Sequence, residues 1–207
     1  HAFIGHMFSD GYSVVDVRDP LHPKTVAFVA APKNTRSHHL QIHGNILLAV
    51  NGPNIWAMQQ YSSQSDYYGK SLADSVQTEQ PFGAGIRVFD VSQPASPREI
   101  GFLNTAGLGA HRIWWVGGHY AYVSVHFEGF IDHVLAVVDV SDPTKPTLAG
   151  RWWLPGMHRA GGEEKPASFG KRTALHHLIS AGNIGYAAWR DGGFTIHDLS
   201  DPANPKL

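Results

Sequence analysis

A fourfold repeat is the feature that most constrains the fold of this chain. Four segments share one pattern: "VVDVRDPLHP" at 14–23, "VFDVSQPASP" at 88–97, "VVDVSDPTKP" at 137–146 and "IHDLSDPANP" at 196–205. Each is a β-branched or aromatic strand that ends in Asp-Val or Asp-Leu and runs into a turn with two prolines. Proline lacks the ladder N–H and fixes its own φ, so such a turn ends one strand and prepares the next.

A second block recurs between these segments. It reads "HHLQIHGNILLAV" from His38, "HRIWWVGGHYAYVS" from His111 and "HHLISAGNIGYAAW" from His176. The same spacing leads from each histidine to Gly44, Gly117 or Gly182, and a Gly-Asn or Gly-Gly step between apolar runs predicts a hairpin. The repeat unit is therefore four short strands, headed by the histidine block and closed by the strand after the proline turn.

Serial four-stranded antiparallel units with almost no helical periodicity predict an all-β fold, a β-propeller of about four blades. The "VVDVSDP" cores resemble the LVIVD repeat, a propeller-type repeat of bacterial and archaeal proteins, many of them on the cell surface. The resemblance covers most of the chain and implies fold more than function. We expect residues 1–207 to form one partial propeller domain that belongs to a larger ring, with a closed four-blade ring as the alternative.

Composition excludes several classes of function. The chain has 16 basic and 17 acidic residues, so it lacks the excess of positive charge that would predict nucleic acid or an anionic membrane as a partner. No apolar run is long enough for a membrane-spanning helix, and no signal peptide is visible, so the compartment stays open. Without cysteine, a metal site would need histidine, carboxylate or carbonyl ligands, and the chain has 14 histidines.

Two insertions interrupt the repeat, at about 52–84 and 154–174. In an up-and-down meander both emerge on the face that carries the heads of the histidine strands. Loops of variable length on a rigid scaffold usually carry binding or catalysis. Trp56, in the first insertion, is a candidate pocket residue because it lies outside the repeat.

His38, His111 and His176 share one repeat position. The functional hypothesis is a ring of imidazoles on the propeller axis that holds Fe, Cu, Zn or Mn. The structural alternative is that each histidine bonds to the backbone of a neighbouring blade. The next position reads His39, Arg112 and His177, and since arginine cannot ligate a metal we expect this mixed ring to bind substrate, with Arg112 steering an anionic group.

A further set of charged and polar residues is expected on the same face. His126 and Arg190 precede the acid-Gly pairs that begin at Glu128 and Asp191, and His6 precedes a similar pair at Asp10. We assign Glu128, Asp191 and His126 to catalysis and Arg190 to substrate binding. The alternative is that Asp-Gly is simply hairpin chemistry.

Two functions follow from these assignments. The first is a metal-dependent enzyme that acts on a small organic substrate, with aromatic compounds among the candidates, by oxidation or lyase chemistry. Other propellers, such as carotenoid-cleaving oxygenases, hold metals near their axes with histidines from several blades, which is a fold-level analogy. The second is a non-catalytic scaffold that recognises a protein or glycan. Besides a small ligand, partners include the remainder of the chain's own propeller or further copies of it.

Overall fold

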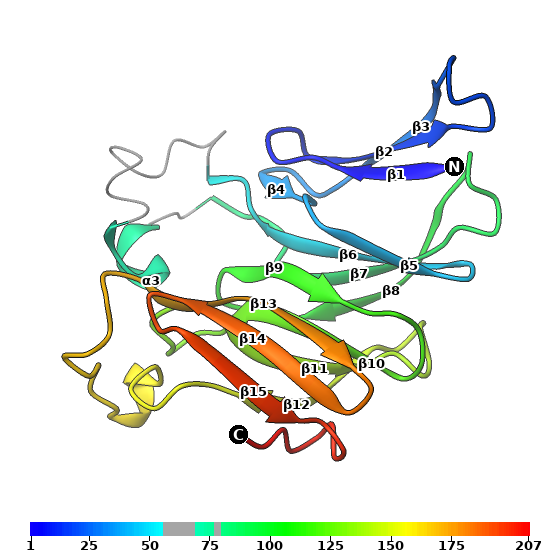
Figure 1. The fold of residues 1–207 in the computed structure, drawn as a ribbon. Helices are drawn as coiled ribbons and strands as arrows, with labels where there is room; N and C mark the ends of the chain where they lie inside the picture. Colours follow the sequence, from blue (N-terminus) through cyan, green and yellow to red (C-terminus); the bar gives the residue numbers. More distant parts are fainter. Residues whose placement is uncertain (56–68, 77–79) are drawn as a thin grey trace.

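The computed structural model describes residues 1–55, 69–76 and 80–207, and these form four antiparallel sheets in series (Figure 1). Sheet I is β1 (Ala2–Gly5), β2 (Gly11–Asp16) and β3 (Lys24–Ala30). Sheet II is β4 (Thr35–Arg36), β5 (Leu40–His43), β6 (Ile46–Pro53), β7 (Gly85–Asp90) and β8 (Arg98–Asn104). Sheet III is β9 (Gly109–Trp114), β10 (Tyr120–His126), β11 (Val134–Asp139) and β12 (Thr147–Trp152). Sheet IV is β13 (Thr173–Ala181), β14 (Ile184–Arg190) and β15 (Phe194–Asp198).

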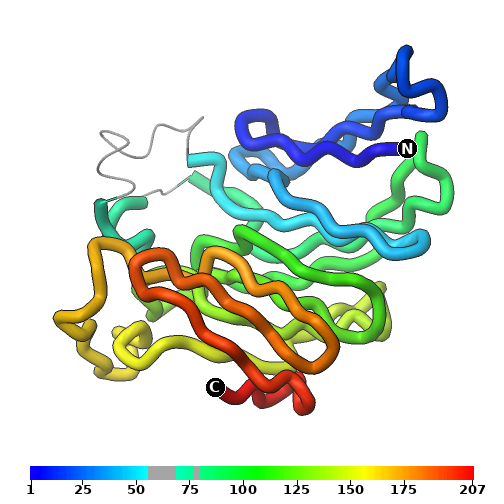
Figure 2. Tube along the Cα trace, viewed as in Figure 1, coloured from blue at the N-terminus to red at the C-terminus, as the bar shows by residue number. Residues whose placement is uncertain are grey.

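The sheets stack in chain order as an open arc, with sheet I at one end and sheet IV at the other (Figure 2). The expected all-β, propeller-like fold is confirmed. The closed four-blade ring is wrong for this chain, because sheets I and IV lie at opposite ends of the stack.

Local chemistry explains the repeated turns. Each repeated aspartate accepts a hydrogen bond from the backbone N–H two residues later: Asp16 from Arg18 at 3.0 Å, Asp90 from Ser92 at 2.9 Å, Asp139 from Ser141 at 2.8 Å and Asp198 from Ser200 at 2.8 Å. The side chain thereby replaces a backbone partner at the strand end, as an Asx turn does. The repeated aspartates therefore stabilise the turns that follow these strands.

Apolar residues between the sheets form the core. Tyr12 and Val14 of sheet I pack against Leu47, Ala49 and Phe89 of sheet II. The opposite face of sheet II, which includes Leu48 and Val88, joins a larger apolar cluster that continues through sheets III and IV. Strands that are apolar on both faces are typical of sheets buried on both sides.

Two glycines let adjacent sheets approach closely. A Cβ on Gly101 of β8 would lie 2.4 Å from the carbonyl oxygen of Pro143, and one on Gly150 of β12 would lie 2.2 Å from that of Ala203. Gly101 pairs with Val88 and Gly150 pairs with Val137, and each valine lies two residues before a repeated aspartate. The proline turn of the next sheet therefore packs onto this strand at a repeated position.

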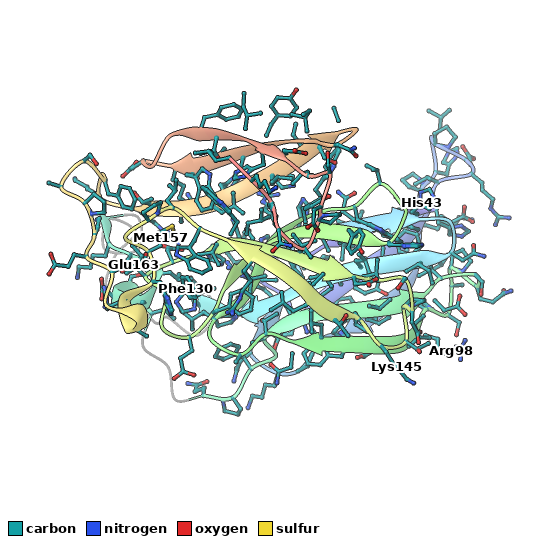
Figure 3. All side chains as sticks on the ribbon, turned by 90° about the horizontal axis from the view of Figure 1, so that it is seen from below. His43, Arg98, Phe130, Lys145, Met157 and Glu163 are labelled. Carbon is teal, nitrogen blue, oxygen red and sulfur yellow. The ribbon has the colours of Figure 1, made fainter. Side chains whose placement is uncertain are left out.

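The two insertions meet at one end of the sheets. The first contains α3 (Leu72–Ser75) and the second contains the 3-10 turn η1 (Arg159–Gly161). Arg159 pairs with Asp74 at 3.1 Å, and the N–H of Ala73 donates to the carbonyl of Ile131 at 3.1 Å. Figure 3 places Phe130, Met157 and Glu163 at this end, with Arg98 and Lys145 at the other.

Candidate functional site

Irregularities in the inner strands place the three repeated histidines. In sheet III the pairing of β10 with β9 shifts between Arg112 and Ala110, so His111 lies in a bulge. In sheet IV the pairing shifts between Thr173 and His177, a stretch that holds His176. In sheet II, β4 ends at Arg36 and β5 begins at Leu40, so His38 precedes the strand that it was expected to head. Bulges re-aim side chains, and in sheets III and IV they occur at the same repeated position.

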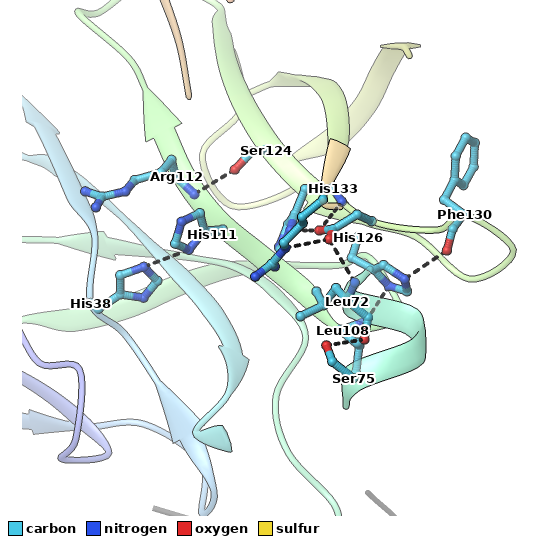
Figure 4. A network of polar contacts seen from close by, with 12 residues as sticks. His38, Leu72, Ser75, Leu108, His111, Arg112, Ser124, His126, Phe130 and His133 are labelled. Atoms are coloured by element: carbon cyan, nitrogen blue, oxygen red, sulfur yellow. Dashed lines mark hydrogen bonds and ion pairs between the residues drawn. The ribbon is translucent and has the colours of Figure 1, made fainter. Parts of the chain in front are cut away.

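These irregularities bring the histidines together. Nε2 of His38 and Nδ1 of His111 share a hydrogen bond of 3.1 Å. The ring of His111 lies 5.2 Å from that of His176 and 5.4 Å from that of His133, centroid to centroid. We call His38, His111, His133 and His176 the histidine group; Figure 4 shows three of its members together with His126.

The pKa of each ring in this group is lowered by burial, so the rings are neutral near pH 7. Burial, reinforced by nearby Arg36 and Arg112, holds the pKa of His38 far below its ordinary value. Burial lowers the pKa of His133 to about 4 despite its contact with Asp132. Burial and nearby arginines, first Arg190, lower the pKa of His176 to about 4. Each ring therefore offers one N–H and one electron pair.

Several nitrogens of the group have no hydrogen-bond partner among the described residues. They are Nδ1 of His38, Nε2 of His111 and Nε2 of His133, all buried. An unmet buried polar atom costs about 1–3 kcal/mol, so three in one place are a feature that a bound ligand would explain.

Asp132 fixes the orientation of His133. The carboxylate accepts from Nδ1 of His133 at 2.8 Å, from Nε of Arg172 at 2.8 Å and from the N–H of Leu72 in the first insertion at 2.8 Å. Burial would raise the pKa of Asp132, but the contacts with His133 and Arg172 lower it below the ordinary value. The bond from Nδ1 leaves Nε2 of His133 as the electron-pair donor.

Sequence reasoning did not place His133, Asp132 or Arg172. The repeat gave no help, because the Asp-His pair occurs in only one unit. The available signal was an adjacent acid and histidine directly before the buried strand β11, on the face that carries the insertions.

His39 and His177, which directly follow His38 and His176, connect their own sheets to sheet III. Nδ1 of His39 accepts from the N–H of Ile113 at 3.3 Å, and Nε2 of His177 donates to the carbonyl of Ile113 at 3.3 Å. Bonding to a neighbouring sheet's backbone was the structural alternative for the repeated histidines, and it describes these two residues instead. Their expected role in binding substrate stays a prediction.

Arg112 lies beside both sets of histidines. Its charge contributes to the lowered pKa of His38, His39 and His176, and its buried Nε has no hydrogen-bond partner within the described residues. Its backbone N–H donates to Oγ of Ser124 at 3.0 Å, which compensates for the ladder bond lost at the bulge.

The residues that were expected to be catalytic have surroundings that differ from those of the histidine group. His126 is buried, with Nδ1 accepting from Leu108 at 3.1 Å and Nε2 donating to the carbonyl of Phe130 at 3.1 Å. Asp191 accepts from the backbone N–H of Arg172 at 2.9 Å. Asp10, which begins the similar acid-Gly pair and was assigned no catalytic role, accepts from the backbone N–H of Asn34 at 3.0 Å. These contacts are those of loop-stabilising residues.

Glu128 is exposed and lines an open cleft of about 570 Å³. Both insertions border this cleft, through Val76 and Arg159, and Phe130 forms part of its wall. Trp56 lies outside the described residues, so its pocket role stays a prediction.

A metal centre is not evident from the side-chain positions. Across residues 1–55, 69–76 and 80–207, no group of three or more histidine, aspartate and glutamate side chains is arranged to hold an ion. The metal role of His38, His111 and His176 is therefore a proposal.

The stacked antiparallel sheets and the repeated Asp-Pro turns define a propeller-like repeat protein. A family model of the LVIVD repeat matches residues 82–105, 109–153 and 179–207, so the chain carries LVIVD repeats. The first copy of the pattern, at 14–23, lies outside these stretches. None of the curated proteins matches the chain. Within the described residues, no helix has the length and apolar character needed to span a bilayer.

Proposed function

We propose that this LVIVD-repeat protein binds a divalent transition metal, one of Fe, Cu, Zn or Mn, at the histidine group. The metal would support oxidation or lyase chemistry on a small organic substrate. The observation that carries the proposal is a pair of buried ring nitrogens that have no hydrogen-bond partner among the described residues, Nε2 of His111 and Nε2 of His133. Neutral imidazole nitrogen is a common ligand of these metals.

Geometry favours His111, His133 and His176 as the ligands. Two imidazoles on one tetrahedral ion, with metal–nitrogen bonds of about 2.0–2.1 Å, have ring centroids about 5 Å apart. The centroid distances from His111 to His133 and to His176 are 5.4 and 5.2 Å. For all three residues to bind one ion, small rotations of the rings would have to bring one nitrogen of each within bonding distance of it.

Two residues would support these ligands from outside. A carboxylate that accepts from the second nitrogen of a ligating histidine is a common device for orienting the ring, and Asp132 bears this relation to His133. His38 would accept from Nδ1 of His111, which leaves Nε2 of His111 to the metal. His38 thus moves from the predicted ligand ring to a supporting position.

The surrounding charge favours an anionic substrate. Arg112 and Arg190 both act on the pKa of His176, and only one buried carboxylate, Asp132, lies in contact with the group in the described part of the chain. An anionic group would be drawn toward Arg112 and would offset the positive potential of the metal. Exposed Glu128 is the predicted catalytic acid that reaches an open cleft.

A second candidate function is a binding module for a protein or glycan. Two observations favour it: the absence of a ready three-donor arrangement within the described ranges, and the structural contacts of His126 and Asp191. The cleft between the insertions would then be the recognition surface.

Elemental analysis of the purified protein tests the metal proposal. We expect close to one transition-metal ion per chain, either as isolated or after incubation with each of the four metals followed by desalting. His111→Ala should lower metal affinity at least tenfold, whereas His22→Ala, which changes an exposed histidine, should not.

Circular dichroism of both variants should match the original protein, so that loss of metal is not loss of fold. Absence of stoichiometric metal under every loading condition would overturn the metal proposal and favour the binding module.

A further inference from the structure

A pocket of about 270 Å³ lies between sheets III and IV. Its lining includes Gly117, where a Cβ would lie 2.6 Å from the ring of His43, and Figure 3 shows His43 at the end of the molecule away from Phe130. The pocket is therefore separate from the cleft at Glu128. We call it the hairpin pocket, and its main aromatic and polar lining residues are Trp114, Tyr120, Tyr122, Ser180 and Asn183.

One face of sheet III forms the aromatic wall of the hairpin pocket. Trp114 pairs with Tyr122 across β9 and β10, and Tyr120 lies two residues before Tyr122, so the three side chains share a face. This face points toward sheet IV, because Nε1 of Trp114 donates to Oγ of Ser180 at 3.0 Å. All three residues are only partly buried. Each therefore keeps surface that a bound ligand could cover.

The pocket exists because a side chain that fills the preceding junction is replaced here. His43 and Val116 hold the same repeat position, directly before the hairpin glycine. Between sheets II and III, the ring of His43 lies over Gly117 and contacts the ring of Trp115 with centroids 5.9 Å apart. Between sheets III and IV, Val116 is 61% exposed, and no atom from elsewhere in the described chain lies within 4 Å of the Cβ position of Gly182. The space that His43 occupies at one junction is therefore open at the next.

The lining of the hairpin pocket combines aromatic rings with neutral hydrogen-bonding groups. Ser180 contributes a hydroxyl and Asn183 an amide, and both groups can donate and accept. Among the described residues, no aspartate, glutamate, lysine or arginine lines it. An ionic ligand would find no opposite charge here, and a purely apolar ligand would leave the hydroxyl and the amide without partners.

A pyranose sugar has the matching chemistry. One side of its ring presents C–H groups, which carry small positive partial charges and stack on the negative face of an aromatic ring. Its hydroxyls donate and accept, as the side chains of Ser180 and Asn183 do. The volume suits a single sugar ring, because pockets for larger organic ligands have about 300–1,000 Å³.

We propose that the hairpin pocket binds one neutral hexopyranose ring, either as a free sugar or as the last residue of a glycan. Trp114 and Tyr122 would stack on the ring, and Ser180 and Asn183 would exchange hydrogen bonds with its hydroxyls. The pocket shares no side chain with the histidine group or with the cleft at Glu128, so it is independent of the proposed metal function. A ligand of this size should bind with a Kd on the order of 1 mM.

Saturation-transfer NMR and tryptophan fluorescence test this proposal on the purified protein. The probes are the methyl glycosides of glucose, galactose, mannose and N-acetylglucosamine, and at least one should bind with a Kd on the order of 1 mM. A disaccharide that ends in the same sugar distinguishes the two sources. Tighter binding of the disaccharide indicates the end of a glycan, and equal binding indicates a free sugar.

Val116→His introduces at this junction the residue that fills the preceding one. The new imidazole should cover Gly182 as His43 covers Gly117, so affinity for the sugar should fall at least tenfold. Trp114→Leu, which removes aromatic surface from the wall, should have the same effect. Val26→His is the matched control and should bind normally, because Val26 is also exposed, at 38%, but lies on sheet I.

Failure of all four glycosides to bind would overturn the proposal, and so would binding that Val116→His and Trp114→Leu leave unchanged. Circular dichroism of the variants should match that of the original protein, so that lost binding is not lost fold. His111→Ala should still bind the sugar, which separates this test from that of the metal proposal.

Discussion

Adjacent identical residues have different roles in this protein, as His38 and His39 show. His38 bonds to the ring of His111, whereas His39 bonds to the backbone of Ile113. The backbone break between β4 and β5 sends the two side chains to different partners. A residue's role at this site therefore depends on the local path of the strand as much as on its chemistry.

Loss of the Asp132 carboxylate should destabilise the folded state. In Asp132→Asn, the guanidinium of Arg172 would lose its buried carboxylate and His133 would lose its orienting acceptor. Breaking a buried ion pair from one side typically costs about 3–5 kcal/mol, so we expect a loss of that size in urea denaturation. Exposed Glu164 provides the control, and Glu164→Gln should change stability by less than about 0.5 kcal/mol. A loss below about 1 kcal/mol for Asp132→Asn would contradict this assignment.

At the scale of the element, one strand–turn unit is built from a few repeated devices. The aspartate closes the turn, glycine makes the hairpin after the histidine block, and the inner strand is irregular where the histidine lies. A fourth repeated feature is the glycine in the last strand of the unit, on which the turn of the following sheet packs.

Gly150→Ala tests this inter-sheet contact. The new Cβ would lie against the backbone oxygen of Ala203, which cannot rotate away as a side chain could. Overpacking of this kind typically costs about 1–3 kcal/mol, which thermal or urea denaturation would measure. Gly182→Ala is the matched comparison: Gly182 has a φ of 56° and no atom within 4 Å, so only backbone strain applies, about 1 kcal/mol. Equal or greater loss in Gly182→Ala would show that the close approach of the sheets is unimportant.

At the scale of the whole molecule, the protein buries several titratable rings where sheets II, III and IV and the two insertions meet. His38, His111 and His133 come from three different segments, and the pKa of each is lowered chiefly by burial. The unfolded chain releases these rings into water, where histidine has a pKa of about 6.5.

Stability should therefore fall as the solution becomes acidic. Below about pH 6.5 the unfolded chain binds protons that the buried rings of His38 and His133 do not bind, so the free energy of unfolding decreases with falling pH. The expected slope is about 1.4 kcal/mol per pH unit for each such histidine, down to about pH 4, where the pKa of folded His133 lies. Urea denaturation between about pH 7 and pH 5 measures it. His38→Gln should reduce the slope by the contribution of one histidine, about 1.4 kcal/mol per pH unit. The same slope in the original protein and in His38→Gln would refute this account.

Much of the fold was predictable because its causes are local. Hairpin glycines, proline turns and aspartates that cap strand ends act over a few residues, and their repetition revealed the unit. The positions of both insertions also followed from the connectivity of a meander. Whether the ring closes was not predictable, because closure depends on how far each sheet turns relative to its neighbour.

The candidate site was predictable only in part. The repeat pointed to His38, His111 and His176, because periodicity marks equivalent positions. It could not identify His133 and Asp132, which occur once, nor tell that His39 and His177 bond to Ile113.

The sequence by itself determined the repeated four-stranded unit, its turns and the end of the sheets that carries the insertions, because those depend on short-range backbone chemistry. Only the tertiary structure decided which ring nitrogens face one another and which have no partner among the residues that the structure describes. Those contacts join residues far apart in the chain, and they depend on bulges and sheet packing that no single segment encodes.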